Sequence, residues 1–338
     1  MVGAARTDYH RWHERSRRFA VITVVMLVLV LVPHIGTELY GARRWFAVGS
    51  LSFQPSAVAT LIAIVFFARW LVDRGPGVRT WKVVRDYSVV LVVLLVLVIL
   101  EKDMGTTMVI AGIGLVILAL AGALKRHLAL IVGAMATLGY LAIKVEAYRA
   151  SRLNNFSNPF ADPLGTGFQS VQSLFALGSG GITGVGLGNS IQKYEWLPEA
   201  HTDFIFAIIG EELGLIGTLA VLLTFIVLAW RGVAASVRAP DTYGALIAGG
   251  ITAWISIQAF INIAAVTNVI PTTGIPLPFI SYGGSSLVVT LVAVGILCNV
   301  SSQGTQQGAS QRAHVDRWGR NRGPSHASAG GRSGAAAG

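Results

Sequence analysis

Long apolar runs separated by short polar or basic stretches are the dominant pattern of this chain. An α-helix needs about 20 apolar residues to cross a bilayer, and a helix satisfies its own backbone hydrogen bonds there. Eight runs reach or approach that length, the third by borrowing flanking residues. They lie near 18–35, 53–73, 86–100, 104–124, 126–145, 203–230, 242–267 and 284–301. The pattern predicts an all-α fold, a polytopic transmembrane helix bundle with eight spans.

Composition agrees with a membrane protein. The chain is 53% hydrophobic and 12% charged, whereas soluble domains carry about 25% charged residues. The single cysteine, Cys298, excludes an intramolecular disulfide and a cysteine-based metal site.

The net charge of +10 at first suggests a nucleic-acid partner. With the N-terminus in the cytoplasm and eight alternating spans, however, most basic residues fall on the cytoplasmic side and most acidic ones on the other. This is the positive-inside rule. We therefore expect a bilayer partner, no nucleic acid and two cytoplasmic termini. The expected parts are a basic N-terminus at 1–17, a transmembrane domain at 18–301 with an outer loop at 146–202, and a disordered tail at 302–338.

Asp203 stands at the head of the apolar run Phe204–Trp230, which only Glu211 and Glu212 interrupt. Ionisable groups at a membrane span are costly unless they are paired or hydrated, which makes them functional candidates. We expect Asp203 in the first turn of a helix, where the macrodipole favours its ionised form. A carboxylate that only caps the helix is the alternative.

Glu211 and Glu212 are expected about 12–13 Å deeper than Asp203, at 1.5 Å per helical residue. Their positions around the helix differ, so both cannot share one cavity with Asp203. Hydrogen bonding between helices is the role we favour for this pair.

Two irregular stretches precede and follow that span. Glycine recurs from Gly178 to Gly188, where it could let the backbone approach a ligand closely or simply form a flexible re-entrant connection. Residues 271–286 contain three prolines and a glycine pair, which exclude a regular helix. Such backbone at membrane depth is tolerated where it is buried in protein or lines a cavity; a purely structural broken helix is the alternative.

The residues from Pro271 to Ser286 closely resemble the hallmark of the FtsW/RodA/SpoVE family, the SEDS peptidoglycan polymerases. The resemblance covers roughly residues 18–301, and the Gly186–Lys193 stretch is most similar to the division branch. Other matching stretches are GARRW at 41–45, FQPS at 53–56, DMGT at 103–106, the loop 148–188, and 197–214.

The resemblance implies a glycosyltransferase that polymerises lipid II on the outer face of the cytoplasmic membrane during division. Asp203 would be the catalytic general base for the acceptor hydroxyl. Guanidinium groups that would suit the pyrophosphate belong to Arg43, Arg44, Arg149 and Arg152. The other expected substrate-binding residues are Trp45, Gln54, Ser56, Asp103, Lys193, Glu199, His201, Pro276, Ser281, Tyr282, Gly283 and Gly284.

The resemblance also implies partners and a location. Lipid II, an undecaprenyl-pyrophosphate-linked glycan, a class B penicillin-binding protein and other division proteins are the expected partners at the septum. The resemblance implies no certain cofactor and leaves a divalent cation open.

Three departures from the family pattern stand out. Two N-terminal helices of the family have no counterpart here. Ala57 and Thr60 replace the acidic residue and the lysine of the family motif, and Asn268 replaces a frequent glycine. A non-catalytic scaffold that binds the transpeptidase is therefore an alternative function, and a lipid II flippase is a second one.

Overall fold

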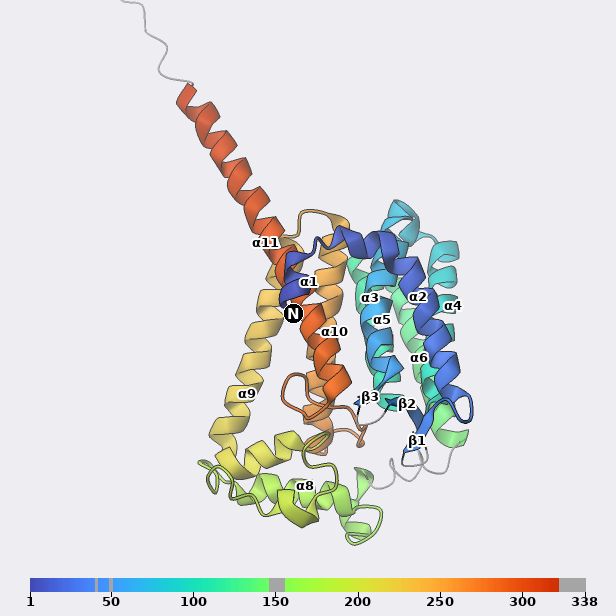
Figure 1. Cartoon of the computed structure of the whole chain (residues 1–338), viewed down its shortest axis with the longest axis vertical. Coiled ribbons are helices and arrows are strands. Elements are labelled where there is room, and N and C mark those ends of the chain that lie inside the picture. The colour runs from blue at the N-terminus through green and yellow to red at the C-terminus, as the bar shows by residue number, and fades with distance from the viewer. Residues whose placement is uncertain (40–41, 49–50, 146–155, 322–338) are drawn as a thin grey trace, which may run out of the picture.

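The long helices stand side by side as one bundle (Figure 1). The computed structural model describes residues 1–39, 42–48, 51–145 and 156–321. Each run that the sequence predicts to span the membrane lies in one helix. These helices are α2 (His10–Leu31), α3 (Pro55–Val72), α4 (Trp81–Leu100), α5 (Met104–Leu120), α6 (Lys125–Val145), α9 (Ile205–Val237), α10 (Thr242–Val266) and α11 (Gly284–Asn321).

The predicted all-α membrane bundle is confirmed. Among the described residues, five helices are long and apolar enough to cross a membrane: α3, α4, α9, α10 and the Gly284–Thr305 part of α11. Helix α5 is shorter, at 17 residues. The crossing by α2, α5 and α6 stays a prediction.

Helices α10 and α3 form the centre of the bundle. In the most apolar stretch of each helix, 72% of the residues are buried in α10 and 67% in α3. The corresponding buried share is 22% in α4 and 11% in α9. Small residues let the helices approach closely: a Cβ at Gly250 of α10 would press against Ile64 of α3 and Ile117 of α5. Helices α4 and α9 therefore form the periphery.

The connection between α2 and α3 contains a small antiparallel sheet that the sequence did not predict. Its strands are β1 (Thr37–Leu39), β2 (Ala42–Val48) and β3 (Leu51–Phe53), in the order β1-β2-β3. The GARRW motif lies largely on β2, which places its arginines beside the end of α4. The sheet lies at the end of the bundle that also carries α8 (Phe168–Ser179) and the short helices η2 (Pro159–Ala161) and η3 (Gln192–Trp196) (Figure 1). We call this the loop end.

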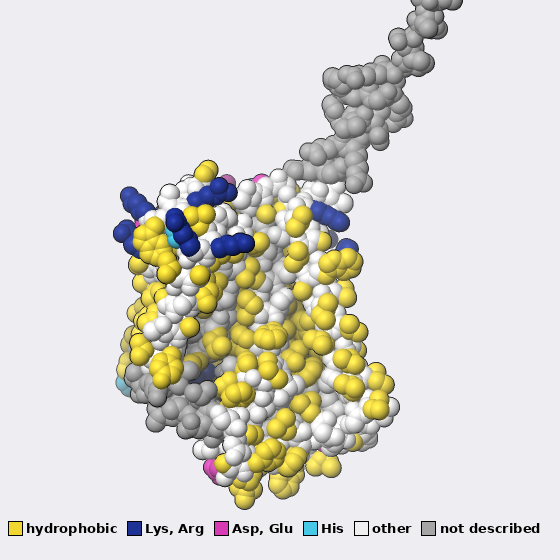
Figure 2. Space-filling view, turned by 180° about the vertical axis from the view of Figure 1, so that it is seen from behind, with side chains coloured by type: hydrophobic (Ala, Val, Ile, Leu, Met, Phe, Trp, Pro, Cys, Tyr) yellow, Lys and Arg dark blue, Asp and Glu magenta, His cyan; other side chains and the backbone are white. Residues whose placement is uncertain are grey.

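The opposite end carries the basic side chains, and we call it the basic end. Figure 2 shows Lys and Arg gathered there, with a largely hydrophobic surface below them. The helix α1 (Val2–Arg6) and the 3-10 helix η1 (Gly75–Arg79) belong to this end. This separation of charge matches the pattern that the positive-inside rule describes.

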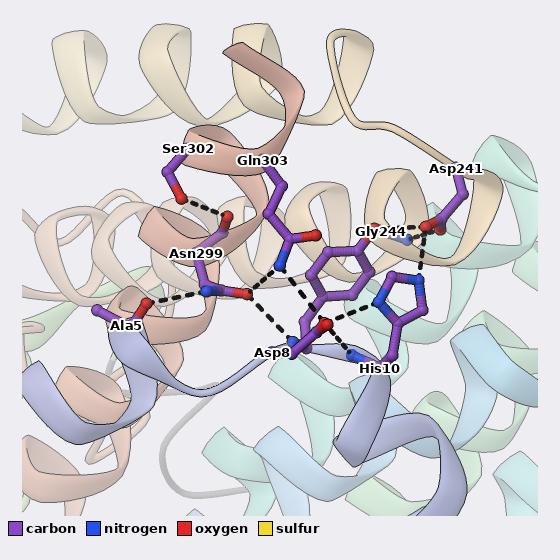
Figure 3. Close-up of polar contacts among 9 residues, drawn as sticks. Ala5, Asp8, His10, Asp241, Gly244, Asn299, Ser302 and Gln303 are labelled. Atoms are coloured by element: carbon purple, nitrogen blue, oxygen red, sulfur yellow. Dashed lines mark hydrogen bonds and ion pairs between the residues drawn. The ribbon is translucent and has the colours of Figure 1, made fainter. Parts of the chain in front are cut away.

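A polar network that is buried at Tyr9 and Asn299 and exposed at His10 and Asp8 fastens the N-terminal segment at the basic end (Figure 3). The Tyr9 backbone N–H donates to Asn299 of α11 at 3.1 Å, and its hydroxyl donates to Asp241, the N-cap of α10. His10 lies between Asp8 and Asp241, at 2.7 and 3.0 Å. The network therefore joins the first helices of the chain to the last two.

Helix α11 continues past the expected domain boundary at 301, to Asn321. Gly304 still packs in the bundle, against the Arg238 carbonyl group. The disorder expected for 302–338 stays a prediction, and residues 322–338 lie outside the described part.

Candidate functional site

Asp203 lies at the loop end, in a turn that immediately precedes α9. The N-cap of α9 is Phe204 and makes no side-chain cap hydrogen bond. The Asp203 backbone N–H donates to the Glu199 carbonyl group at 3.1 Å. The expectation that Asp203 occupies the first helical turn is therefore wrong, because the turn from Glu199 ends one residue later.

Asn262 of α10 holds this turn against the residues that follow α10. Its side-chain amide donates to the carbonyl groups of Asp203 and Ile275, both at 2.7 Å. The Asp203 carboxylate faces Gly274, where a Cβ would lie 3.4 Å from its Oδ2. Gly274 has a φ of +73°, so glycine suits this position both by backbone conformation and by the room it leaves.

Residues 271–283, which we call the bridge segment, connect α10 to α11. Ser281 donates to the Thr202 carbonyl group at 2.5 Å and accepts from Leu277 N–H at 2.7 Å. The Tyr282 N–H donates to the His201 carbonyl group at 2.9 Å. The bridge segment therefore holds the Asp203 turn and brings Ser281, Tyr282 and His201 together, while their expected contact with substrate stays a prediction.

Asp103 is the second carboxylate of the site and caps α5. It accepts from Thr106 N–H at 2.9 Å, from Gln54 at 3.1 Å and from Ser56 at 3.3 Å. Gly105, two residues on, packs against Ile275 of the bridge segment. Asp103 and Asp203 thus flank the same short stretch, residues 273–275.

Glu101 is a residue of this site that sequence reasoning missed. Its side chain is fully buried just after α4, close to Ser56 and Asp103. Burial, aided by the charge of Asp103, raises its pKa to about 8, against the opposing effect of Arg44. The signal available in the sequence was a second acidic residue two positions before Asp103.

The arginines of the GARRW motif are held by protein groups. Arg44 donates to the carbonyl groups of Glu101, at 2.9 Å, and Lys102, at 2.5 Å, and so caps the C-terminus of α4. Arg43 pairs with Glu38 at 3.1 Å, on the neighbouring strand. Their expected contact with pyrophosphate stays a prediction.

Other expected site residues lie in or around the same region. Trp45 is on β2, opposite Thr37. Pro276 accepts from Gln258 at 2.9 Å, and Gly283 directly precedes α11, which begins at Gly284. Arg149 and Arg152 lie outside the described residues.

The glycine-rich loop 178–188 approaches the chain's own helix α9, which bends at Gly214 (φ 65°, ψ −160°). In a regular helix the N–H groups of residues 215 and 216 would bind the carbonyl groups of 211 and 212. The bend breaks both bonds, and the loop replaces them from both sides. The four replacements are Leu215 N–H to Gly181 O at 2.9 Å, Ile216 N–H to Ile182 O at 3.2 Å, Val185 N–H to Glu211 O at 3.0 Å and Gly186 N–H to Glu212 O at 3.0 Å.

We call residues 211–216 of α9 the elbow. Close approach explains the glycines, because a Cβ at Gly184 would overlap the Glu212 carbonyl oxygen and one at Gly180 that of Gly210. The flexible re-entrant connection considered from the sequence is therefore replaced by a fixed clamp. The expectation of a loop that approaches a ligand has no support within the described residues.

Glu211 and Glu212 also serve this clamp, and their partners lie in the loop and on the short helix η3, in place of the expected partners on other helices of the bundle. The buried Glu211 carboxylate accepts from Ser190 at 2.5 Å and from Ile191 N–H at 3.0 Å. Glu212 pairs with Lys193 at 2.8 Å, which assigns Lys193 to the elbow and not to the Asp203 turn. Because α9 bends at Gly214, the depth inferred from a straight helix does not apply either.

Thr60 shows how this chain fills the position of the family's lysine. Its side chain is buried and donates to the Ser56 carbonyl group of its own helix at 3.0 Å.

Within the described residues, no three or more His, Cys, Asp or Glu side chains form a group that could hold a metal ion. The divalent cation therefore stays a prediction.

Comparisons with known proteins agree with this geometry. The family model described as cell cycle protein, FtsW/RodA/SpoVE, matches residues 1–306. Stage V sporulation protein E of Bacillus subtilis (strain 168) is 44% identical over 297 residues, which cover 87% of this chain and 81% of that protein. The probable peptidoglycan glycosyltransferase FtsW of Geobacter metallireducens is 41% identical over 305 residues, covering 90% and 81%.

Two solved structures are similar along most of their length. One, from work on the coordination of polymerization and crosslinking by a peptidoglycan synthase complex, has a TM-score of 0.75 at 27% identity, and the match covers 90% of this chain and 85% of that chain. The rod shape determining protein RodA of Thermus thermophilus has a TM-score of 0.64 at 26% identity, covering 88% and 81%. A two-carboxylate site at the loop end of such a bundle, together with these matches, shows that the chain belongs to the FtsW/RodA/SpoVE family.

Proposed function

We propose that this chain is a peptidoglycan glycosyltransferase that polymerises lipid II into glycan strands. The observation that carries the proposal is the placement of Asp203. Its turn is held by Asn262 and the bridge segment at the loop end. Asp103, with its partners Gln54 and Ser56, forms what we call the Asp103 group, which lies on the other side of residues 273–275. A half-buried carboxylate there can meet sugars from the aqueous side while a polyprenyl tail stays in the bilayer.

In the proposed reaction Asp203 is the general base. The acceptor sugar's 4-hydroxyl oxygen bonds to the anomeric carbon of the donor, and its proton passes to the Asp203 carboxylate. The bond from that carbon to the pyrophosphate oxygen breaks, and undecaprenyl pyrophosphate leaves with the electron pair. Asp103 and Gln54 lie on the other side of residues 273–275 and would orient the sugars by hydrogen bonds, while the buried Ser56 holds Asp103 in place.

The proposed orientation places the basic end in the cytoplasm and the loop end outside. The gathering of Lys and Arg at one end supports it (Figure 2). Both termini would then be cytoplasmic. We further propose a location at the division septum and a class B penicillin-binding protein as partner, supported by the likeness to a structure that couples polymerization with crosslinking.

Polymerisation of purified lipid II, assayed with the transpeptidase partner, tests the base assignment. We expect Asp203→Ala to lower glycan yield by about 10²–10⁴-fold, the usual contribution of a general base. Asp162→Asn is the control, because this carboxylate is exposed in the loop before α8. Equal yields from wild type and Asp203→Ala would overturn the assignment.

A non-catalytic scaffold is the second candidate, and the observation that favours it is the uncharged pair at positions 57 and 60. The same assay separates the two functions. A wild-type chain that binds the transpeptidase and yields no polymer would support the scaffold, and Thr60→Lys with Ala57→Glu would then be expected to restore synthesis.

A further inference from the structure

Six exposed apolar side chains form a continuous surface at the elbow, which we call the elbow patch. Their exposed fractions range from 37% for Leu213 to 75% for Leu187. The four backbone hydrogen bonds between loop and helix fix them relative to one another. The patch consists of Ile182, Val185 and Leu187 of the loop with Leu213, Leu215 and Ile216 of α9.

The elbow patch continues the most exposed helix face of the bundle. Only 11% of the most apolar stretch of α9 is buried, and a membrane-spanning helix with such a face contacts lipid. Six further exposed apolar side chains follow the patch along α9. They are Leu219, Leu222, Leu223, Ile226, Val227 and Trp230.

The charged side chains that contact the elbow, among those the structure describes, are paired or buried. Glu212 forms an ion pair with Lys193 at 2.8 Å, and Glu211 is buried among its hydrogen-bond donors. Insertion of the patch among acyl chains would therefore leave neither carboxylate as an unpaired charge in an apolar environment.

Aromatic side chains mark the edge of the same surface. Tyr194 and Trp196 are 72% and 54% exposed and line a cavity of about 320 Å³ together with Ser190 and Ile191. Tyr and Trp are enriched where a protein crosses from acyl chains to lipid headgroups. Their position, further along the loop towards Asp203, is the one such a boundary would have.

We propose that the elbow patch is inserted among the acyl chains of the leaflet at the loop end, with Tyr194 and Trp196 at its headgroups. The glycine-rich loop then enters only the outer part of one leaflet and anchors the loop end there. Lipid is the occupant of the patch. Residues 197–203 continue directly from this anchor, so it sets the height of the Asp203 turn above the acyl chains. The inference does not depend on the proposed activity.

Nitroxide labels in the full-length chain, reconstituted alone in lipid nanodiscs, test the proposal. The single cysteine makes a Cys298→Ser background simple to build, and labels are placed through Leu187→Cys and Ile182→Cys. Leu223→Cys on the outer face of α9 is the lipid reference, and Asn158→Cys, exposed beside η2, is the aqueous reference. Electron paramagnetic resonance then compares collisions with oxygen, which concentrates in acyl chains, and with a water-soluble nickel chelate.

We expect the oxygen-to-nickel accessibility ratio at both patch positions to match Leu223→Cys and to exceed Asn158→Cys several-fold. A ratio equal to that of Asn158→Cys would overturn the proposal, because the patch would then face water. Protection from both reagents would overturn it as well, since it would show the patch packed against protein.

Discussion

The elbow and the bridge segment are both interruptions of helical backbone, but their hydrogen bonds are completed by different groups. At the elbow, the backbone of the glycine-rich loop supplies the missing partners. At the bridge segment, side-chain amides of α10 supply several of them, with Asn262 binding the carbonyl groups of Asp203 and Ile275 and Gln258 binding that of Pro276, beside one backbone bond from the Tyr282 N–H to the His201 carbonyl group. The elbow therefore depends on the absence of side chains, and the bridge segment depends on their identity.

The difference follows from what each region contacts. The elbow lies at the periphery on α9, where a second stretch of backbone can approach from outside the bundle. The bridge segment meets α10, whose most apolar stretch is 72% buried, so its partner is a helix that has already used its own backbone groups. Only the side chains of α10 remain available to bind the carbonyl groups of the bridge segment, and buried polar groups must find partners.

The largest expected effect comes from adding one methyl group to the loop at the elbow. Gly184→Ala would place a Cβ against the Glu212 carbonyl oxygen at a residue with φ of +79°. Overpacking and the left-handed conformation together should cost about 2–5 kcal/mol. The control is Gly178→Ala, where the new Cβ meets nothing within 4 Å. Thermal unfolding in nanodiscs should show a large fall in Tm for the first variant and none for the second.

The next effect, of similar size in stability, is expected from the amides that hold the bridge segment. Asn262→Leu leaves two carbonyl groups without their donor, at about 1–3 kcal/mol for each group that stays unsatisfied. It also releases the Asp203 turn, so we expect polymer yield to fall further than stability alone explains. Gln258→Leu frees the Pro276 carbonyl group and the Trp254 indole N–H, neither of which belongs to the Asp203 turn, and is the matched comparison. Equal losses of yield from both variants would contradict a special role for Asn262.

The smallest effect concerns pH. Between about pH 4.5 and about pH 8 the unfolded chain releases the Glu101 proton while the folded chain keeps it. The folded state then binds more protons, so its stability falls as pH rises through this range. Glu101→Gln should flatten the fall, as measured by Tm in buffers across the range. Glu38→Gln, an exposed carboxylate at the same end, should leave the slope as it is.

Sequence reasoning found the bundle because apolar runs report membrane helices directly. It placed Asp203 inside the first turn of α9, whereas Asp203 lies in the separate turn that starts at Glu199 and precedes the helix. Nothing in the local sequence distinguishes these two kinds of turn. The elbow was invisible for a related reason. Gly214 is one of many glycines, and its conformation is decided by the distant loop 181–186.

The motifs also located the Asp103 group and the bridge segment without showing how they meet. Gly105 packs on Ile275 across a separation along the chain that no spacing rule covers. Glu101 was missed because its environment comes from residues distant along the chain, among them Arg44, which donates to its carbonyl group. Long-range packing therefore decided what the pattern of residues could not.

The order of the chain has a consequence for how the two interruptions are built during synthesis. Domains form from the N-terminal side as the chain emerges. Loop residues 181–186 are made before the elbow at 211–216, and Gln258 and Asn262 are made before Ile275 and Pro276. In both cases the groups that complete the backbone already exist when the interrupted stretch leaves the ribosome. Each broken stretch can thus be paired on arrival, with no interval in which its bare amides face lipid.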